Sequence, residues 1–352
     1  MKKKSLLVTG SCGLVGSEIV DLLHKDFDLV YGLDNNSRKI FFGQGGDISV
    51  RKKMLQRKIK NYKHLNLDIK NRKQIIDLIQ KIRPETIVHC AGQPSHDLAA
   101  QIPFKDFDTN TVGTFNLLEA TRMTSNKIKF IFLSTNKVYG DRPNNIELIE
   151  SKKRYSYKDK NFINGIGETL SIDQSTHSLF GSSKLAADIM VQEYGRYFNI
   201  FTCCIRAGCI TGPHHSGVKL HGFLNYLIKS NLLKRKYTIF GYKGKQVRDN
   251  IHAKDLVYFI KYFIDKPRVG EVYNIGGGYQ NSISILEAFE LAYKYSNIKM
   301  VSSYNKTNRV GDHVCYYSDL SKAKMHYPNW EIKINLDKIF FEIIENFNQN
   351  KK

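Results

Sequence analysis

A glycine-rich turn near the start of the chain places the strongest constraint on its fold. Gly10, Gly13 and Gly16 follow the apolar run Leu6–Thr9, and the residues after them, Leu14–His24, carry a helical pattern. Glycines spaced in this way between a strand and a helix permit a tight turn and let backbone amides approach a phosphate closely. The turn therefore predicts a strand–loop–helix unit that holds a phosphate-bearing ligand at the N-terminus of the helix.

The first 135 residues extend this unit by alternating β-rich runs with helical patterns. The expected strands are Leu6–Thr9, Leu29–Leu33, His64–Leu67, Thr86–Cys90 and Phe130–Ser134, and the expected helices are Leu14–His24, Arg72–Lys81 and Phe107–Thr121. Such alternation predicts an α/β fold, a Rossmann-type doubly wound parallel sheet with right-handed crossovers. Ligands of these sheets bind at the carboxyl ends of the strands.

Asp34 indicates which ligand the turn holds. It lies at the end of the second expected strand, about 20 residues beyond the glycine loop, where a carboxylate binds ribose hydroxyls and repels a 2′-phosphate. This favours NAD over NADP, although Arg38 nearby could accommodate that phosphate. The residues expected to bind NAD are Gly10, Gly13, Leu14, Val15, Gly16, Asp34, Asn35, Ser37, Arg38, Asp68, Ile69, Ala91, Gly92, Gln93 and Asn110.

Past residue 135 the alternation loosens. The expected helices are Ser182–Phe198, Leu220–Lys229, Asp255–Ile264, Ile285–Tyr295 and Leu336–Phe347, with strands at Ile200–Arg206 and Glu271–Ile275. We expect residues 1–206 to form the NAD-binding Rossmann domain. Residues 207–352 are expected to form mainly a smaller C-terminal substrate-binding lobe, interleaved with the first domain.

The composition excludes several classes of protein. The chain is 41% hydrophobic and 25% charged, as globular proteins are, and its apolar runs are shorter than the roughly 18 residues that a membrane span needs. The apolar run after the N-terminal lysines is too short for a signal peptide, so we expect a cytoplasmic protein with no membrane partner. The six cysteines show no C-x-x-C spacing and are expected to be buried thiols. The neighbouring histidines at 214 and 215 lack a completing ligand set, so no metal site is expected.

The net charge of +21 raises the question of a nucleic-acid partner. The basic residues are spread along the chain, with one dense run at 51–60, and no nucleic-acid-binding motif accompanies them. A ligand that carries a polyphosphate explains the charge equally well. We therefore expect no nucleic acid among the partners.

Four segments, in this order, resemble one family. They are Asp34-Asn-Asn-Ser-Arg38, Ser134-Thr-Asn-Lys-Val-Tyr-Gly-Asp141, Gly244-Lys-Gln-Val-Arg-Asp249 and Asn274-Ile-Gly-Gly277. Together with the glycine loop they resemble the extended short-chain dehydrogenase/reductase family of NAD-dependent epimerases and dehydratases, over nearly the whole chain. Within that family the chain is most similar to the CDP-paratose 2-epimerase branch.

The resemblance implies an NAD-dependent epimerisation of a nucleotide-diphosphate sugar, with a CDP-sugar favoured, through transient oxidation to a keto sugar and re-reduction. In the family the base is the tyrosine of a Y-x-x-x-K motif, assisted by a hydroxyl at the end of the fifth strand, here Thr135 beside Ser134. This chain reads Phe180-Gly-Ser-Ser-Lys184. The lysine, which in the family also contacts the nicotinamide ribose, is present, but phenylalanine has no ionisable proton and cannot be the base.

Three hypotheses follow from this substitution. In the first, another group accepts the proton: Lys184 in its neutral form, Tyr139, His177 or a water held by Thr135. In the second, the protein is a nucleotide-sugar dehydrogenase or an epimerase at another carbon. In the third, it binds NAD and a nucleotide but is catalytically silent.

The resemblance also implies a substrate site and an assembly. Arg248 and Arg309 would grip the nucleotide diphosphate, for which a guanidinium is suited, unless they form salt bridges instead. His96 lies in a loop that would approach the sugar. The family is typically homodimeric through helices that correspond to Phe107–Thr121 and Ser182–Phe198, so we expect a homodimer.

Overall fold

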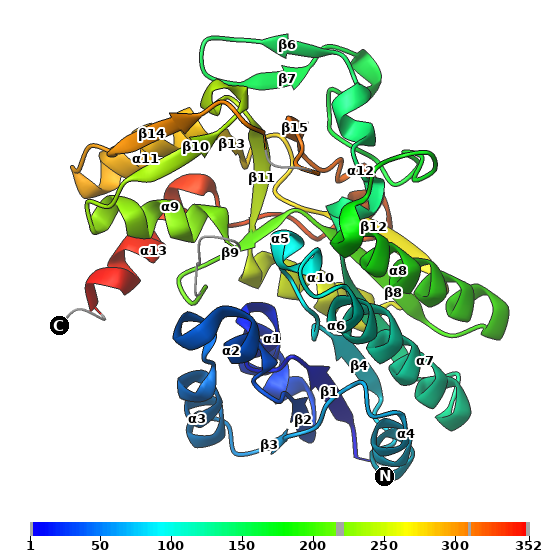
Figure 1. The fold of residues 1–352 in the computed structure, drawn as a ribbon. Helices are drawn as coiled ribbons and strands as arrows, with labels where there is room; N and C mark the ends of the chain where they lie inside the picture. The colour runs from blue at the N-terminus through cyan, green and yellow to red at the C-terminus, as the bar shows by residue number, and fades with distance from the viewer. Residues whose placement is uncertain (1–2, 216–221, 309–310, 350–352) are drawn as a thin grey trace. The chain divides into compact units, whose positions relative to one another are not determined.

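The computed structural model describes residues 3–215, 222–308 and 311–349 (Figure 1). Contacts within the chain divide it into two compact units, each built from three separate segments. The first unit comprises Met1–Val138, Leu179–Arg206 and Leu256–Tyr273, and the second comprises Tyr139–Ser178, Ala207–Asp255 and Asn274–Lys352. The predicted division into an NAD-binding domain and a substrate-binding lobe at residue 206 stays a prediction.

The first unit is organised around a seven-stranded sheet with the order β12-β8-β5-β4-β1-β2-β3. Its strands are β1 (Ser5–Thr9), β2 (Leu29–Leu33), β3 (Tyr62–Leu65), β4 (Thr86–His89), β5 (Lys129–Thr135), β8 (Thr202–Ala207) and β12 (Glu271–Ile275). The pairs β1–β2, β1–β4, β2–β3 and β4–β5 are parallel. The winding direction reverses between β1 and β4, so the loops after these two strands meet at the switch point where ligands of such sheets bind.

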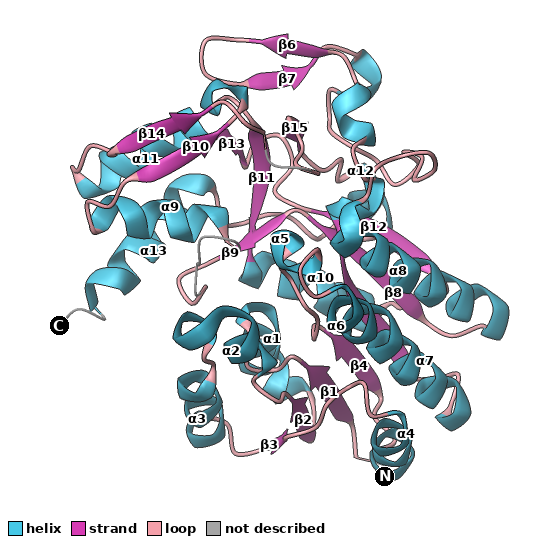
Figure 2. Cartoon of the chain, viewed as in Figure 1, coloured by secondary structure: helices cyan, strands magenta, loops and turns pink. Residues whose placement is uncertain are grey.

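Helices cover both faces of this sheet (Figure 2). The helices of this unit are α1 (Leu14–Leu23), α2 (Ser37–Phe42), α3 (Ser49–Lys58), α4 (Arg72–Ile82), α5 (His96–Ala99), α6 (Pro103–Phe107), α7 (Gly113–Thr124), α8 (Ser178–Phe198) and most of α10 (Ala253–Asp265). One core joins α4, α7 and α8 to the sheet and includes Val272 of β12. The next residue, Tyr273, points to the opposite face, where its ring lies 5.1 Å from that of Phe259 in α10. The predicted doubly wound α/β fold is therefore confirmed.

The second unit has smaller sheets and its own core. Its strands are β6 (Leu148–Glu150), β7 (Tyr155–Tyr157), β9 (Cys209–Thr211), β10 (Tyr237–Phe240), β11 (Val247–His252), β13 (Ser282–Ser284), β14 (Ser302–Asn305) and β15 (Cys315–Tyr316). Its helices are α9 (Phe223–Leu232), α11 (Ile285–Ser296), α12 (Ser321–His326) and α13 (Leu336–Gln349). Apolar side chains of α9, α11 and α13 pack together with β10 in this core.

One expected helix is divided in the structure. The segment Phe107–Thr121 begins at the end of α6, passes through the π-helical turn Asp108–Val112 and continues as α7. The periodicity of apolar residues does not distinguish a π turn from an α turn, so the sequence predicted one uniform helix. The expected helix Leu220–Lys229 corresponds to α9, but its first two residues lie outside the described ranges.

Across the described ranges, no helix combines the length and apolar character that crossing a bilayer requires.

Candidate functional site

The glycine loop between β1 and α1 leaves no space for a side chain at Gly10 or Gly16. Gly10 has a φ of +65°, and a Cβ atom there would lie 2.8 Å from the amide nitrogen of Ala91. A Cβ on Gly16 would lie 2.1 Å from the carbonyl oxygen of Gly10. Gly13 is the N-cap of α1, and no side chain caps this helix. The amides of its first turn are therefore available to an anion at the positive end of the helix dipole, an arrangement that fits a dinucleotide pyrophosphate.

Asp34 is fixed at the carboxyl end of β2 by two backbone amides. Its Oδ2 accepts a hydrogen bond from Cys12 N, and its Oδ1 accepts one from Asn36 N, both at 3.0 Å. Burial raises the pKa of this carboxyl, and the two amides oppose that shift. Each oxygen keeps a lone pair that can accept a bond from a ribose hydroxyl. The guanidinium of Arg38 lies 4.9 Å from the ring centroid of Phe42 in the same helix.

The loop after β4 is tied to the π-helical turn by Asn110. Its Oδ1 accepts a bond from Gln93 N at 2.9 Å, and its Nδ2 lies 3.2 Å from Gln93 O. A Cβ on Gly92 would lie 2.9 Å from the same Oδ1. The side chain of Asn110 thus shapes the backbone of the loop that begins at Ala91.

Asp106 is a buried carboxylate beneath this loop, and sequence reasoning missed it. It accepts hydrogen bonds from Gln93 Nε2 at 2.7 Å, Asn110 Nδ2 at 3.1 Å and Ser183 Oγ at 2.5 Å. Burial raises its pKa, while the bonds from Ser183 and Gln93 oppose that shift. The available signal was its position four residues before Asn110, on the same helical face.

The two residues predicted after β3 differ in their surroundings. Ile69 is 4% exposed and belongs to the core with α4, α7 and α8, so its side chain serves packing. Asp68 accepts a bond from Lys70 N at 2.9 Å and is partly exposed. Of this pair, only Asp68 presents a polar side chain to solvent.

Lys184 of α8 lies in the interior beside the end of β5. Its Nζ donates a hydrogen bond to Leu133 O at 2.6 Å and lies 4.0 Å from the ring centroid of Phe132. Burial lowers the pKa of Lys184 to about 8, with the Asp188 carboxylate opposing the shift. Phe180 is 8% exposed and lies one turn earlier in α8. Thr135, at the end of β5, accepts a bond from Lys137 N at 3.2 Å.

Ser134 is bound to a buried ion pair that the sequence analysis also missed. Its hydroxyl donates to Asp188 Oδ2 at 2.5 Å. Arg206 contacts the same carboxylate through Nη2 at 2.8 Å and Nε at 3.2 Å. The hydroxyl of Ser134 is therefore engaged with α8. A lone arginine in the apolar run of β8 was the signal for this pair.

Two alternative proton acceptors named from the sequence lie in the second unit. Tyr139 is fully buried, and its hydroxyl donates to Asn274 Oδ1 at 2.8 Å. His177 is half-buried, and its Nε2 has no hydrogen-bond partner within the described part of the chain.

Of the predicted substrate residues, Arg248 lies in β11 of the second unit. Its Nη2 is 2.6 Å from Asp312 Oδ1, and its Nη1 donates to Val247 O at 2.7 Å. A salt bridge therefore occupies part of its guanidinium. His96 begins α5, with its Nδ1 3.6 Å from Asp97 Oδ1. Arg309 lies outside the described residues.

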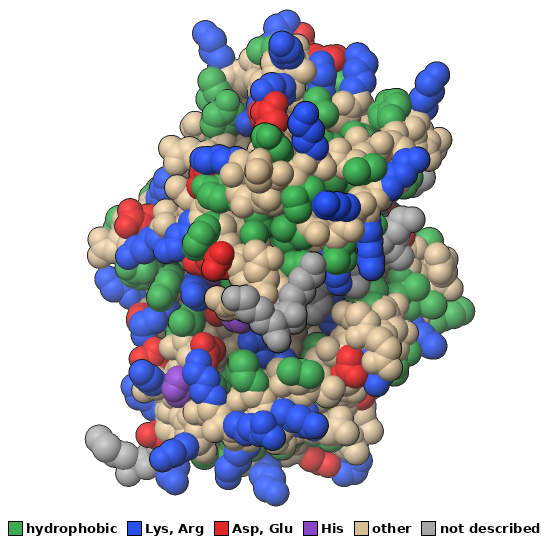
Figure 3. Space-filling view, turned by 90° about the vertical axis from the view of Figure 1, so that its left-hand side faces the viewer, with side chains coloured by type: hydrophobic (Ala, Val, Ile, Leu, Met, Phe, Trp, Pro, Cys, Tyr) green, Lys and Arg blue, Asp and Glu red, His purple; other side chains and the backbone are tan. Residues whose placement is uncertain are grey.

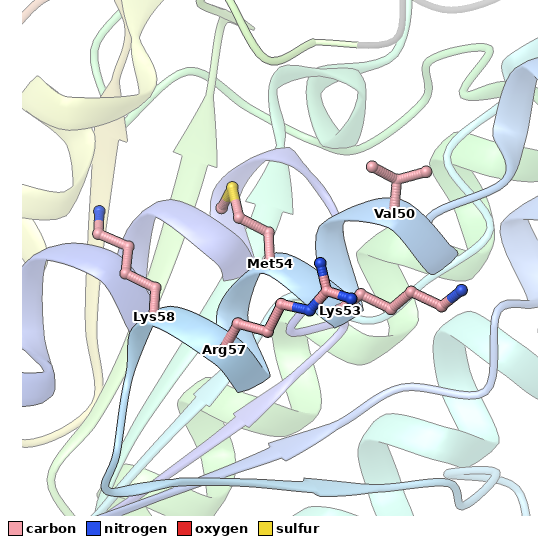
Figure 4. Close-up of a pocket in the computed structure, with 5 residues that line it drawn as sticks. All are labelled: Val50, Lys53, Met54, Arg57 and Lys58. Atoms are coloured by element: carbon pink, nitrogen blue, oxygen red, sulfur yellow. The ribbon is translucent and has the colours of Figure 1, made fainter.

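A surface pocket lies along α3 and is lined by one face of that helix. Its residues are Val50, Lys53, Met54, Arg57 and Lys58 (Figure 4), and none of them is among the predicted site residues. Figure 3 shows lysine and arginine side chains over much of one face, with acidic side chains between them. Within the described residues, no cluster of histidine, cysteine and carboxylate side chains is suited to a metal ion.

Comparison with known proteins agrees with this geometry. The model of the NAD dependent epimerase/dehydratase family matches residues 6–276. The chain belongs to this family. CDP-paratose 2-epimerase of Salmonella typhi is 34% identical over 338 residues, which cover 94% of this chain and 95% of the relative. The dTDP-glucose 4,6-dehydratase of Salmonella typhimurium is 27% identical over 77% of this chain and 72% of its own length.

Solved structures of nucleotide-sugar enzymes share the fold. UDP-glucose 4-epimerase of Thermotoga maritima, determined with UDP-glucose, superimposes with a TM-score of 0.79 at 24% identity and covers 99% of this chain and 100% of its own. A tyrosine-to-phenylalanine mutant of UDP-glucuronic acid 4-epimerase from Bacillus cereus, in complex with NAD and a fluorinated sugar nucleotide, gives 0.80 at 24% identity, covering 98% and 99%.

Proposed function

We propose that this protein is an NAD-dependent epimerase of a nucleotide-diphosphate sugar, acting through transient oxidation to a keto sugar. The observation that supports it most is the 34% identity, over nearly its whole length, to a CDP-paratose 2-epimerase. That relationship favours a CDP-linked sugar as the substrate and C2 as the carbon that is inverted.

The loops around the switch point supply the cofactor site in this proposal. The amides of the α1 N-terminus would hold the pyrophosphate, and Asp34 would bind the adenosine ribose. The crowded positions of Gly10 and Gly16 fit this role, since glycine at these two positions permits the tight turn that brings the backbone close to a phosphate. When bound, NAD would accept a hydride from the sugar and return it to the opposite face.

Lys184 is the proton acceptor that we propose in place of the missing tyrosine. Its pKa of about 8 leaves roughly a tenth of the lysine neutral at pH 7, and a neutral amine can accept a hydroxyl proton. The hydroxyl of Thr135, whose oxygen already accepts the amide of Lys137, would donate to or orient the reacting oxygen. Proton and hydride would return to the keto sugar in the second half of the cycle, so acid and base roles balance.

A panel of sugar nucleotides tests this proposal. Purified protein is incubated with NAD and CDP-, GDP- or UDP-linked sugars, and 340 nm absorbance reports NADH while NMR reports the sugar configuration. We expect a new epimer without net NADH from a CDP-sugar. Stoichiometric NADH with an oxidised product would indicate a dehydrogenase instead. Binding of NAD and nucleotide without any conversion would support the catalytically silent alternative.

A further inference from the structure

The most complete polar network of the first unit surrounds a residue that the proposed mechanism does not use. The Asp188 carboxylate is fully buried and accepts bonds from Ser134, from Nε and Nη2 of Arg206 and from Gln192 Nε2 at 2.7 Å. A buried carboxylate of this kind is stable only when its charge is paired and its lone pairs are filled. We propose that Asp188 is a positioning residue for Lys184, because its carboxylate holds α8 in register with β5 through Ser134. The same negative charge also acts on the Lys184 ammonium. This inference rests on the role proposed for Lys184.

Two hydrogen bonds to adjacent residues of β5 fix the register between α8 and β5. Lys184 and Asp188 are four residues apart in α8 and therefore lie on one face of the helix. Lys184 bonds to the carbonyl of Leu133, and Asp188 bonds to the hydroxyl of the next residue, Ser134. Two consecutive residues of β5 are thus attached to consecutive turns of α8. This attachment fixes where β5 ends, and so where Thr135 lies relative to the lysine.

The charge argument follows from the groups around the lysine. Those that act on Lys184 are Cys90 after β4, Asp106 of α6, Asp188 of α8 and Cys204 of β8. Burial raises the pKa values of both thiols, which keeps them neutral, and burial lowers the pKa of nearby His89, which is neutral as well. Asp188 has the largest opposing effect on the lysine, and it is the carboxylate that carries its own arginine partner.

A titration of the lysine itself tests the proposal without requiring turnover. Protein labelled with ¹³Cε-lysine is followed by NMR against pH, and the Lys184 signal is assigned by its loss in Lys184→Met. Asp188→Asn should lower the midpoint of this signal by about one pH unit, since removing an adjacent negative charge disfavours the ammonium. Glu193→Gln makes the same chemical change on an exposed side chain of α8, and it should leave the midpoint unchanged. An unchanged midpoint in Asp188→Asn would overturn the proposal.

Asp188→Asn leaves Arg206 buried without its carboxylate partner, which destabilises the folded state. A second variant therefore tests the proposal without this unpaired charge. Asp188→Leu with Arg206→Met removes both charges, a replacement that buried ion pairs often tolerate. The double variant should also titrate at lower pH than the wild type, and a wild-type midpoint in the folded double variant would contradict the proposal.

Kinetics distinguish this proposal from the proposed function. With a sugar nucleotide that the wild type converts, Asp188→Asn should shift the rising limb of the pH profile to lower pH by the same amount as the NMR midpoint. On the plateau above pH 9, where the lysine is neutral in both proteins, kcat should fall because the amine is a weaker base and is less firmly positioned, with KM within about twofold. A wild type that converts no sugar nucleotide would refute the proposed function, while the NMR titration would still decide the role of Asp188.

Discussion

The glycine loop before α1 and the first turns of α8 contribute to one proposed site, but only α8 departs from the family pattern. In the glycine loop the backbone would bind the cofactor, and the positions of Gly10 and Gly16 leave no room for a Cβ atom. In α8 the expected chemistry depends on a single phenolic oxygen, and Phe180 lacks it. A change of one atom thus leaves packing intact while removing the usual base. Cofactor binding and catalysis can therefore be separated by mutation.

The largest expected effect is that of Lys184→Met. If Lys184 is the proton acceptor, kcat for epimerisation should fall about 10³-fold, within the range for loss of a general base. NAD affinity, measured by calorimetry, should fall by no more than about tenfold, because the glycine loop is unaltered. Retained kcat would place the base elsewhere, with Tyr139 and His177 as the next residues to replace.

Gly16→Val should impair NAD binding by the glycine loop and leave α8 unaltered. The added side chain would collide with the carbonyl of Gly10, so we expect NAD affinity to fall about 100-fold, or about 2.7 kcal/mol. Gly167→Val is the matched control, since a Cβ there meets nothing within 4 Å. Undiminished NAD binding in Gly16→Val would mean that the cofactor does not use this loop.

The pH dependence of the rate also distinguishes the role of α8 from that of the glycine loop. Only the neutral amine of Lys184 accepts a proton, and its pKa is about 8. The rate should therefore rise about tenfold between pH 7 and a plateau above pH 9, while NAD affinity stays nearly constant. Single-turnover measurement of NADH formation gives this profile, and a flat rate across that interval would argue against the lysine.

Phe180→Tyr has the smallest expected effect. It would restore the phenol of the family motif beside Lys184, so we expect kcat to rise about threefold to tenfold and the base limb to move. Stopped-flow NADH absorbance and chemical-shift analysis of the sugar report both changes. If a folded, NAD-binding variant behaves as the wild type does, Phe180 does not lie next to the reacting carbon.

The sequence predicted the first unit better than the second because strands that are buried on both faces appear as continuous apolar runs between helical patterns. The segment Leu29–Leu33 was predicted with the bounds of β2, whereas the predicted strand His64–Leu67 is shifted by two residues toward the C-terminus relative to β3. The helix Ser49–Lys58 was not predicted, since Leu55 is its one buried residue and no apolar stripe marks it. The short strands of the second unit, such as β6 and β15, are too brief to show alternation.

Residues of the proposed site were predicted from the sequence only where they belong to a recognisable motif. Phe180 and Lys184 could be located from their spacing. Asp188, Arg206 and Asp106 were missed because their local signals are weak and several of their partners are distant along the chain. Ser134 donates to Asp188 across 54 positions. Such pairs become visible only when the strands and helices are assembled. The catalytic and binding roles assigned to the named residues stay predictions until variants are measured.

The π-helical turn at Asp108–Val112 has a consequence for how this chain can change in length. A π turn holds one more residue than an α turn. Deleting Thr109 would therefore restore a regular helix and leave α7 at nearly its present rotation, but it would reduce the spacing between Asp106 and Asn110 from four residues to three. The extra residue thus sets how Asn110 reaches both Asp106 and Gln93, and relatives that lack it should hold the loop after β4 by other contacts.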